Sequence, residues 1–208
     1  MAKIQTDMIH GPLLGKIVMF AIPYAATGIL EQLFNSINVF VVGRFASSHA
    51  LAAVGATTFL VSLVINLFMG VSIGANAVIA NYIGRQDRQG VRRAVSTTVA
   101  LSLMSGVLLM VIGLLVATPL LRLLGTPDDV ISDSALYLHI YFLSSPFFMV
   151  YNFGAAIFRS KGDTRTPLYI LAVAGVINIV VSMVTVIVFQ MSVAGVACAT
   201  LVSNVFSS

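Results

Sequence analysis

The chain has 208 residues and a net charge of +4; 59% of its residues are hydrophobic, only 9% are charged, and the mean hydropathy is +1.03. Soluble globular domains carry about 25% charged residues, so the composition excludes soluble enzymes, nucleic-acid-binding proteins and disulfide-bonded scaffolds. The charges are also clustered. Four stretches lack Lys, Arg, Asp and Glu: 45–84, 94–121, 134–158 and 166–208. Because a membrane span takes about 20 apolar residues, the sequence predicts a polytopic membrane protein.

Charge gaps and turn-forming residues divide the chain into predicted helices over residues 13–42, 50–83, 92–118, 134–158, 167–189 and 194–208. The third is expected to end before Pro119, because proline breaks helices. Clustered turn formers predict a loop over 124–129. Thr166 is expected to cap the fifth helix, and Pro167 suits its first turn. The sixth is cut short by the end of the chain, so we expect an all-α membrane protein with five complete transmembrane helices and a truncated sixth.

Basic residues predict the orientation of these helices in the membrane. Nine of them fall at the N-terminus and in two loops on the same side: Lys3, Lys16, Arg85, Arg88, Arg92, Arg93, Arg159, Lys161 and Arg165. The opposite side has only Arg44 and Arg122. Short cytoplasmic loops are enriched in Lys and Arg, so we expect a cytoplasmic N-terminus, with the basic loops near anionic membrane lipid.

Polar residues inside the predicted spans are candidates for function, because they are expensive in lipid. Glu31 lies near the middle of the first helix, where a carboxylate costs about 3 kcal/mol, so it is expected to face a cavity or to be protonated. Asn35 and Asn38 share its helical face. Asn178, Ser182 and Thr185 form a second stripe on the fifth helix. Together the stripes predict a water-filled cavity opening to the outer half, although such residues also hydrogen-bond neighbouring helices.

Small residues and a proline predict local packing and bending. Gly70 and Gly74 form a pair spaced by four residues, which allows helices to approach closely. Pro23 lies in the inner half of the first helix, where we expect a kink or hinge.

Several motifs together resemble the multidrug and toxic compound extrusion (MATE) family. They are Pro23, Leu33-Phe34-Asn35, Val42-Gly43-Arg44, residues 50–55 (ALAAVG), 70–75 (GVSIGA) and 159–167 (RSKGDTRTP), and Asn178 followed by residues 195–200 (GVACAT). Members of that family have about twelve helices in two six-helix lobes. The resemblance therefore implies that the chain corresponds to the N-terminal lobe.

The resemblance implies cation-coupled (H⁺ or Na⁺) export of organic, often cationic, drugs by alternating access. Carried over by position, the family's coupling site would comprise Asn38, Asn178, Ser182 and Thr200, with Glu31 in the same cavity and Pro23 at the bend. The family often has Asp at the positions of Asn38 and Ser182. We hypothesise that Glu31 supplies the titratable group instead. We expect no metal site, with Na⁺ at the coupling site left open as the alternative to H⁺.

The residues show no nucleophile–base pair, metal cluster or phosphate-binding loop, so we expect neither an enzyme nor a cofactor beyond the coupling ion. The implied location is the plasma (inner) membrane, and the implied partners are small organic substrates, lipid and a second lobe or a second copy of the chain, but no nucleic acid. Two alternatives stay open: a truncated product without transport activity, and a related flippase for a lipid-linked precursor. A flippase would favour a basic central cavity, and the predicted spans contain no Lys or Arg.

Overall fold

The structure, a computed structural model, describes residues 13–46 and 48–208, and its regular elements in that part of the chain are helices. They are α1 (Leu13–Phe45), α2 (Ser48–Gly84), α3 (Arg88–Leu123), α4 (Asp128–Leu143), α5 (Ser145–Ser160), α6 (Arg165–Met183), the π-helical segment η1 (Val184–Val188) and α7 (Ser192–Ser207). The predicted all-α class is confirmed. Within the described residues four helices are long and apolar enough to cross a membrane, and the bent pair α4–α5 makes a fifth candidate.

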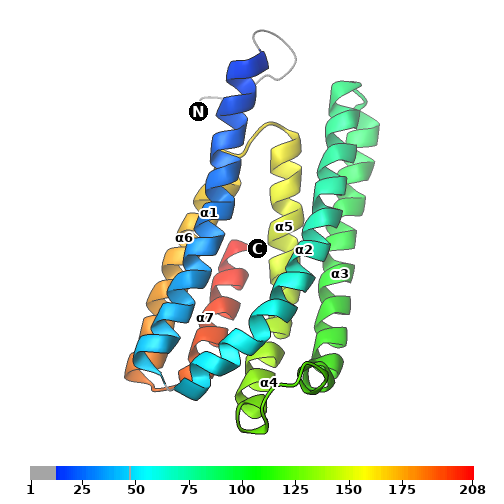
Figure 1. Cartoon of the computed structure of the whole chain (residues 1–208). Helices are drawn as coiled ribbons and strands as arrows, with labels where there is room; N and C mark the ends of the chain where they lie inside the picture. Colours follow the sequence, from blue (N-terminus) through cyan, green and yellow to red (C-terminus); the bar gives the residue numbers. More distant parts are fainter. Residues whose placement is uncertain (1–12, 47) are drawn as a thin grey trace.

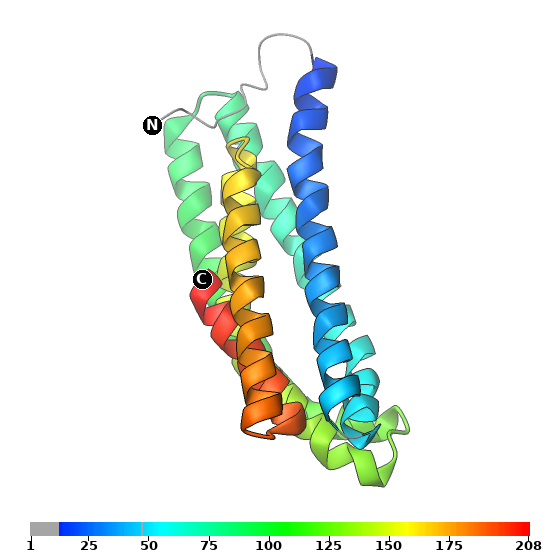
Figure 2. The ribbon, with the colours of Figure 1, turned by 90° about the vertical axis from the view of Figure 1, so that its left-hand side faces the viewer.

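Helices α1, α3 and α6 run in one direction, and α2, the bent pair α4–α5 and α7 run in the other (Figure 1 and Figure 2). The start of α1 and the α2–α3 and α5–α6 connections lie together at one end, which we call the basic end because it carries Arg85, Arg159 and Lys161. The α1–α2, α3–α4 and α6–α7 connections lie at the opposite end. From there α7 rises only to the middle of the bundle. Of the nine basic residues assigned to one side, Lys3 lies outside the described residues.

The predicted helix over 134–158 is wrong in one respect: two helices, α4 and α5, take its place, bent by 48° about Ser144. Pro146 explains the break, because proline lacks the N–H that would bond the preceding turn and its ring clashes with a carbonyl there. The Ser144 hydroxyl donates to the carbonyl of Tyr141 at 2.7 Å and closes the last turn of α4. The bend therefore arises from a proline that we did not use as a break signal.

Two boundaries around the α3–α4 connection also differ from the prediction. Helix α3 continues through Pro119 to Leu123. One missing N–H is tolerated there, because the fully buried Leu121 anchors the last turn. The loop predicted over 124–129 ends early, since α4 already begins at Asp128. Acidic residues in a first helical turn interact favourably with the helix dipole.

The start of α6 is capped by a different residue from the one predicted. The carboxylate of Asp163 accepts hydrogen bonds from the backbone N–H groups of Arg165 (3.1 Å) and Thr166 (3.0 Å). Its second oxygen accepts from the Thr166 hydroxyl at 2.6 Å. Thr166 is thus held by the cap and is not the cap itself, whereas Pro167 lies in the first turn as predicted.

Glycines allow close helix packing, but not the pair that we predicted. A Cβ added at Gly70 or Gly74 would meet nothing within 4 Å. On α3, a Cβ at Gly113 would overlap the ring of Phe142, and one at Gly106 would lie 2.6 Å from the Cα of Pro146. Helix α3 therefore packs tightly against both arms of the bend, while many large apolar side chains on the outer faces of the helices remain exposed, as lipid-facing residues are.

Candidate functional site

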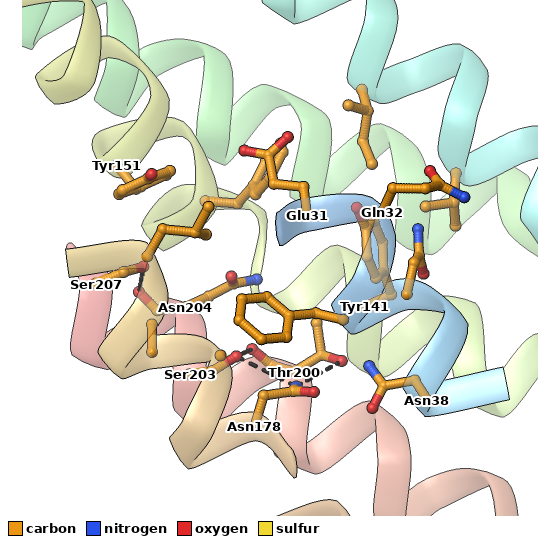
Figure 3. Close-up of a pocket in the computed structure, with 18 of the residues that line it drawn as sticks. Glu31, Gln32, Asn38, Tyr141, Tyr151, Asn178, Thr200, Ser203, Asn204 and Ser207 are labelled. Atoms are coloured by element: carbon orange, nitrogen blue, oxygen red, sulfur yellow. Dashed lines mark hydrogen bonds between the residues drawn. The ribbon is translucent and has the colours of Figure 1, made fainter. Parts of the chain in front are cut away.

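Side chains from α1, α2, α4, α5, α6 and α7 enclose a cavity of about 320 Å³ (Figure 3). Of the residues predicted for the site, Glu31, Asn35, Asn38, Asn178 and Thr200 line it. The polar stripe predicted on the first helix and Asn178 of the stripe predicted on the fifth helix thus meet in one cavity.

Two predicted site residues do not line this cavity. Ser182 is fully buried one turn beyond Asn178 on α6. Pro23 lies inside an unbroken α1, and its carbonyl accepts a hydrogen bond from the hydroxyl of Thr27 at 3.0 Å. A hinge at Pro23 stays a prediction.

A cluster of amide and hydroxyl groups joins α6 to α7 in the cavity wall. The side-chain nitrogen of Asn178 donates to the hydroxyls of Thr200 at 3.5 Å and Ser203 at 3.4 Å. Both hydroxyls in turn donate to carbonyls of their own helix, those of Val196 and Thr200 respectively. The amide nitrogen of Asn178 is therefore occupied, and its oxygen is left for another partner.

Three buried side-chain oxygens of predicted site residues lack a hydrogen-bond partner within the described residues. They are Oδ1 of Asn38, Oδ1 of Asn178 and Oγ of Ser182. A buried polar atom without a partner costs about 1–3 kcal/mol. Oxygen atoms are the ligands that hard cations prefer, so the donor set has the chemistry of a site for a small cation or for water.

Glu31 occupies a different part of the cavity from these oxygens. In Figure 3 its carboxylate points away from Asn178 and Asn38, on the side where Tyr151 lies. The side chain is half-buried, and Tyr141 and Tyr151 line the same cavity. The cavity thus has a carboxylate at one end and neutral oxygens at the other.

Aromatic side chains form much of the remaining wall. Tyr137 and Tyr141 stack with ring centroids 6.4 Å apart. The hydroxyl of Tyr151 donates to the carbonyl of Pro167 at 3.2 Å, which fixes the ring between α5 and α6. The ring of Phe34 fills the space that a side chain at Gly175 would occupy. The wall therefore offers flat apolar faces around one negative charge.

Helix α7 carries a polar stripe that was not predicted from the sequence. Ser203, Asn204 and Ser207 line the cavity together with Thr200. Their spacing of three to four residues places them on one helical face, in a segment that is otherwise apolar. That periodicity was visible in the sequence and would have identified the stripe.

A second pocket, of about 250 Å³, adjoins the cavity between α1 and α2. It shares Asn35 and Asn38 with the cavity and extends past Thr57 and Thr58, toward the α1–α2 connection. Polar side chains therefore continue from the cavity toward the end opposite the basic end.

The family profile described as MatE matches residues 23–184 of this sequence, which is most of the chain. The chain belongs to the MatE family. The match includes α1, where Glu31 and Asn38 lie, and the Asn178 position on α6. The resemblance inferred from the motifs is confirmed, and so is the expected multi-pass membrane architecture.

MatE relatives among curated proteins are multidrug resistance proteins. The chain is 31% identical over 191 residues to the probable multidrug resistance protein YoeA of Bacillus subtilis (strain 168), a match that covers 90% of this chain and 41% of the relative. It is 29% identical over 198 residues to the probable multidrug resistance protein YpnP of the same organism, covering 95% of this chain and 44% of the relative. The chain therefore spans less than half the length of these relatives.

Solved MATE structures share the fold of this MatE chain. A crystal structure of MATE in the bent conformation superimposes with a TM-score of 0.87 and 26% identity, covering 92% of this chain and 43% of that one. An outward-facing conformation of a multidrug resistance MATE family transporter of the MOP superfamily superimposes over 100% of this chain and 46% of that one, with a TM-score of 0.90 and 24% identity. The helices described above thus correspond to one lobe of a MATE fold.

Proposed function

We propose that the chain forms the N-terminal lobe of a cation-coupled antiporter that exports organic drugs and other xenobiotics across the plasma membrane by alternating access. The observation that carries this proposal is that the unpartnered oxygens of Asn38 and Asn178 belong to residues that line the same cavity as Glu31. The unpartnered hydroxyl of Ser182 is buried one turn beyond Asn178 on α6. Buried polar atoms without partners are retained at a cost to stability, and a transported cation or its water would supply the missing partners.

The coupling ion in this proposal is H⁺ or Na⁺. It is transported across the membrane and is not a cofactor that stays bound to the protein. The oxygens of Asn38, Asn178 and Ser182 suit Na⁺ by hardness, but none of them carries a charge. The negative charge comes from Glu31, which we propose as the titratable group that couples ion and substrate. An organic cation would bind against the carboxylate and the aromatic rings of Tyr141 and Tyr151, since cations are attracted to ring faces.

The orientation proposed for the membrane puts the basic end in the cytoplasm. The α2–α3 and α5–α6 connections, together with the helix ends next to them, carry most of the Lys and Arg residues of the described part of the chain, and such residues favour the cytoplasmic side. The N-terminus would then be cytoplasmic as well.

A second lobe, or a second copy of this chain, is proposed to supply the opposite wall of the transport path. Binding sites of such transporters lie at the interface between repeats, and the relatives are more than twice as long as this chain. The residues lining the cavity include no Lys or Arg, which favours a cationic drug over the anionic head group of a lipid-linked precursor.

The test is ethidium efflux from membrane vesicles that contain the protein, driven in turn by a pH gradient and by a Na⁺ gradient. We expect Glu31→Gln to abolish pH-driven efflux. The control is Ser36→Ala on the same helix, because the Ser36 hydroxyl only donates to the carbonyl of Gln32. Normal efflux by the Glu31→Gln variant would refute the role of Glu31, and efflux driven only by Na⁺ would identify the ion.

A further inference from the structure

The basic end of α5 carries a cation that the proposed function does not use. The guanidinium of Arg159 lies over the ring of Tyr24 on α1, 4.7 Å from the ring centroid. Among the described residues it forms no hydrogen bond and no ion pair. A pocket of about 220 Å³, lined also by Asn76, surrounds this contact and leaves the guanidinium room to move.

Helices α1 and α5 face each other across a gap that side chains bridge. No Cα atoms of the two helices, both within the described ranges, come within 8 Å of each other. Tyr24 and Arg159 meet in this gap near the basic end. Farther along it lie Glu31 and Tyr151, which line the cavity described above.

The directions of the two helices point the two charged side chains toward each other. Side chains on a helix lean toward its N-terminus. Glu31 follows Tyr24 by seven residues, two turns on the same face of α1, and leans back toward the basic end. Arg159 belongs to α5, which runs in the opposite direction (Figure 1), and leans away from the basic end.

We propose that Arg159 is a built-in countercharge for Glu31, which a cationic substrate displaces. Without substrate, the guanidinium leaves the Tyr24 ring and pairs with the Glu31 carboxylate. When an organic cation takes the carboxylate, the guanidinium returns to the ring, as in the conformation described here. This assignment rests on the proposed function, and makes Arg159 a residue that sets affinity for cations without touching them.

Competition of this kind has a definite effect on affinity. The apparent affinity for a ligand equals its intrinsic affinity multiplied by the fraction of molecules in which the binding site is free. Suppose that the Arg159 guanidinium pairs with the Glu31 carboxylate in about 90% of the molecules without substrate. Removal of the Arg159 guanidinium then tightens the binding of an organic cation about tenfold. Loss of the Tyr24 ring acts in the opposite direction, because it removes the alternative position of the guanidinium.

The experiment measures the binding of ethidium by fluorescence to the full 208-residue chain in nanodiscs. We expect Arg159→Gln to tighten binding about tenfold and to have no effect in a Glu31→Gln background. The control is Arg165→Gln, which removes an exposed positive charge from the same end of the molecule. Unchanged or weaker binding by Arg159→Gln would overturn the proposal, as would an effect that persists without Glu31.

Variants of Tyr24 separate this role from a structural one. Tyr24→Leu is expected to weaken ethidium binding, and Tyr24→Phe, which keeps the ring, to leave it unchanged. A purely structural contact between Tyr24 and Arg159 would make loss of either partner act in the same direction. That result would overturn the proposal.

If the unaltered chain does not bind ethidium, the proposed function loses its support for this lobe, and stability decides the inference. Unfolding is then measured in mixed dodecyl maltoside–SDS micelles for the unaltered chain, Glu31→Gln, Arg159→Gln and the double variant. We expect Arg159→Gln to lower stability only where Glu31 is present. Additive effects would mean that the two charges do not pair, and would overturn the proposal.

Discussion

The side-chain amide of Asn204 on α7 donates a hydrogen bond to the hydroxyl of Ser144 at 3.1 Å. Ser144 is the residue at which α4 and α5 meet, so this bond ties the last helix of the chain to the bend. The same Ser144 hydroxyl donates to the carbonyl of Tyr141. One hydroxyl thus closes the end of α4 and accepts a bond from a residue of the cavity wall.

Asn204→Ala should therefore loosen the bend. We expect a loss of about 1 kcal/mol in unfolding free energy, the net contribution of a typical hydrogen bond, measured in mixed detergent micelles. Ser207→Ala serves as the control, because the Ser207 hydroxyl bonds only to a carbonyl of its own helix. Equal stability of the two variants would show that the Asn204–Ser144 bond contributes nothing.

Gly106→Ala should destabilise the fold through overpacking. The added Cβ would lie 2.6 Å from the Cα of Pro146, and backbone cannot move aside as a side chain can. We expect a loss of about 1–3 kcal/mol in the same unfolding assay. Gly74→Ala, where nothing lies within 4 Å, should instead gain about 0.5–1 kcal/mol from the better helix propensity of alanine. The decisive result is that the unfolding free energy falls in Gly106→Ala and rises in Gly74→Ala.

Asp163→Ala should fray the start of α6. Its carboxylate accepts the N–H groups of Arg165 and Thr166, and loss of such a cap costs about 1 kcal/mol. Asp163→Asn keeps an acceptor oxygen and should lose less. Hydrogen exchange at the amides of Arg165 and Thr166 provides the readout, and unchanged protection in Asp163→Ala would contradict the assignment of the cap.

Asn38→Asp should change ion binding at the neutral end of the cavity. The Oδ1 atom of Asn38 is buried without a partner, and a carboxylate in its place would attract a cation. We expect Na⁺, titrated by calorimetry, to bind more tightly to Asn38→Asp than to the unaltered chain. Leu33→Asp, at an exposed position of the same helix that lines neither pocket, controls for charge alone. Equal affinities in both variants would place the ion elsewhere.

Charge gaps in the sequence predicted the spans well, because lipid permits few charges anywhere along a helix. The polar stripe on α1 was equally clear, since Glu31 and Asn38 stand out in apolar surroundings. The predicted helix ends failed at the prolines, where the local preference of the residue competes with the packing of its neighbours. Pro119 has the same chemistry as Pro146, yet only Pro146 coincides with a break, and the sequence does not show which proline has anchored neighbours.

The glycine and capping predictions failed for a related reason. Gly70 and Gly74 have the spacing for close approach, but a Cβ added at either one meets nothing within 4 Å. The glycines that matter, Gly106 and Gly113, face a bend that was itself not predicted. At α6, Thr166 and Asp163 are both good caps, and only the backbone path between them decides which one reaches the free N–H groups.

The dependence of α1 on α6 has a consequence for how the chain is made. Phe34 finds its place against Gly175, which is synthesised long after α1 has left the ribosome, since chains emerge N-terminal end first. Until then α1 lies in the bilayer with Glu31 and Asn38 lacking the cavity around them. A translocon or chaperone that binds α1 during this interval would keep the polar stripe of Glu31 and Asn38 away from lipid. The yield of folded protein would then depend on how quickly α6 is synthesised.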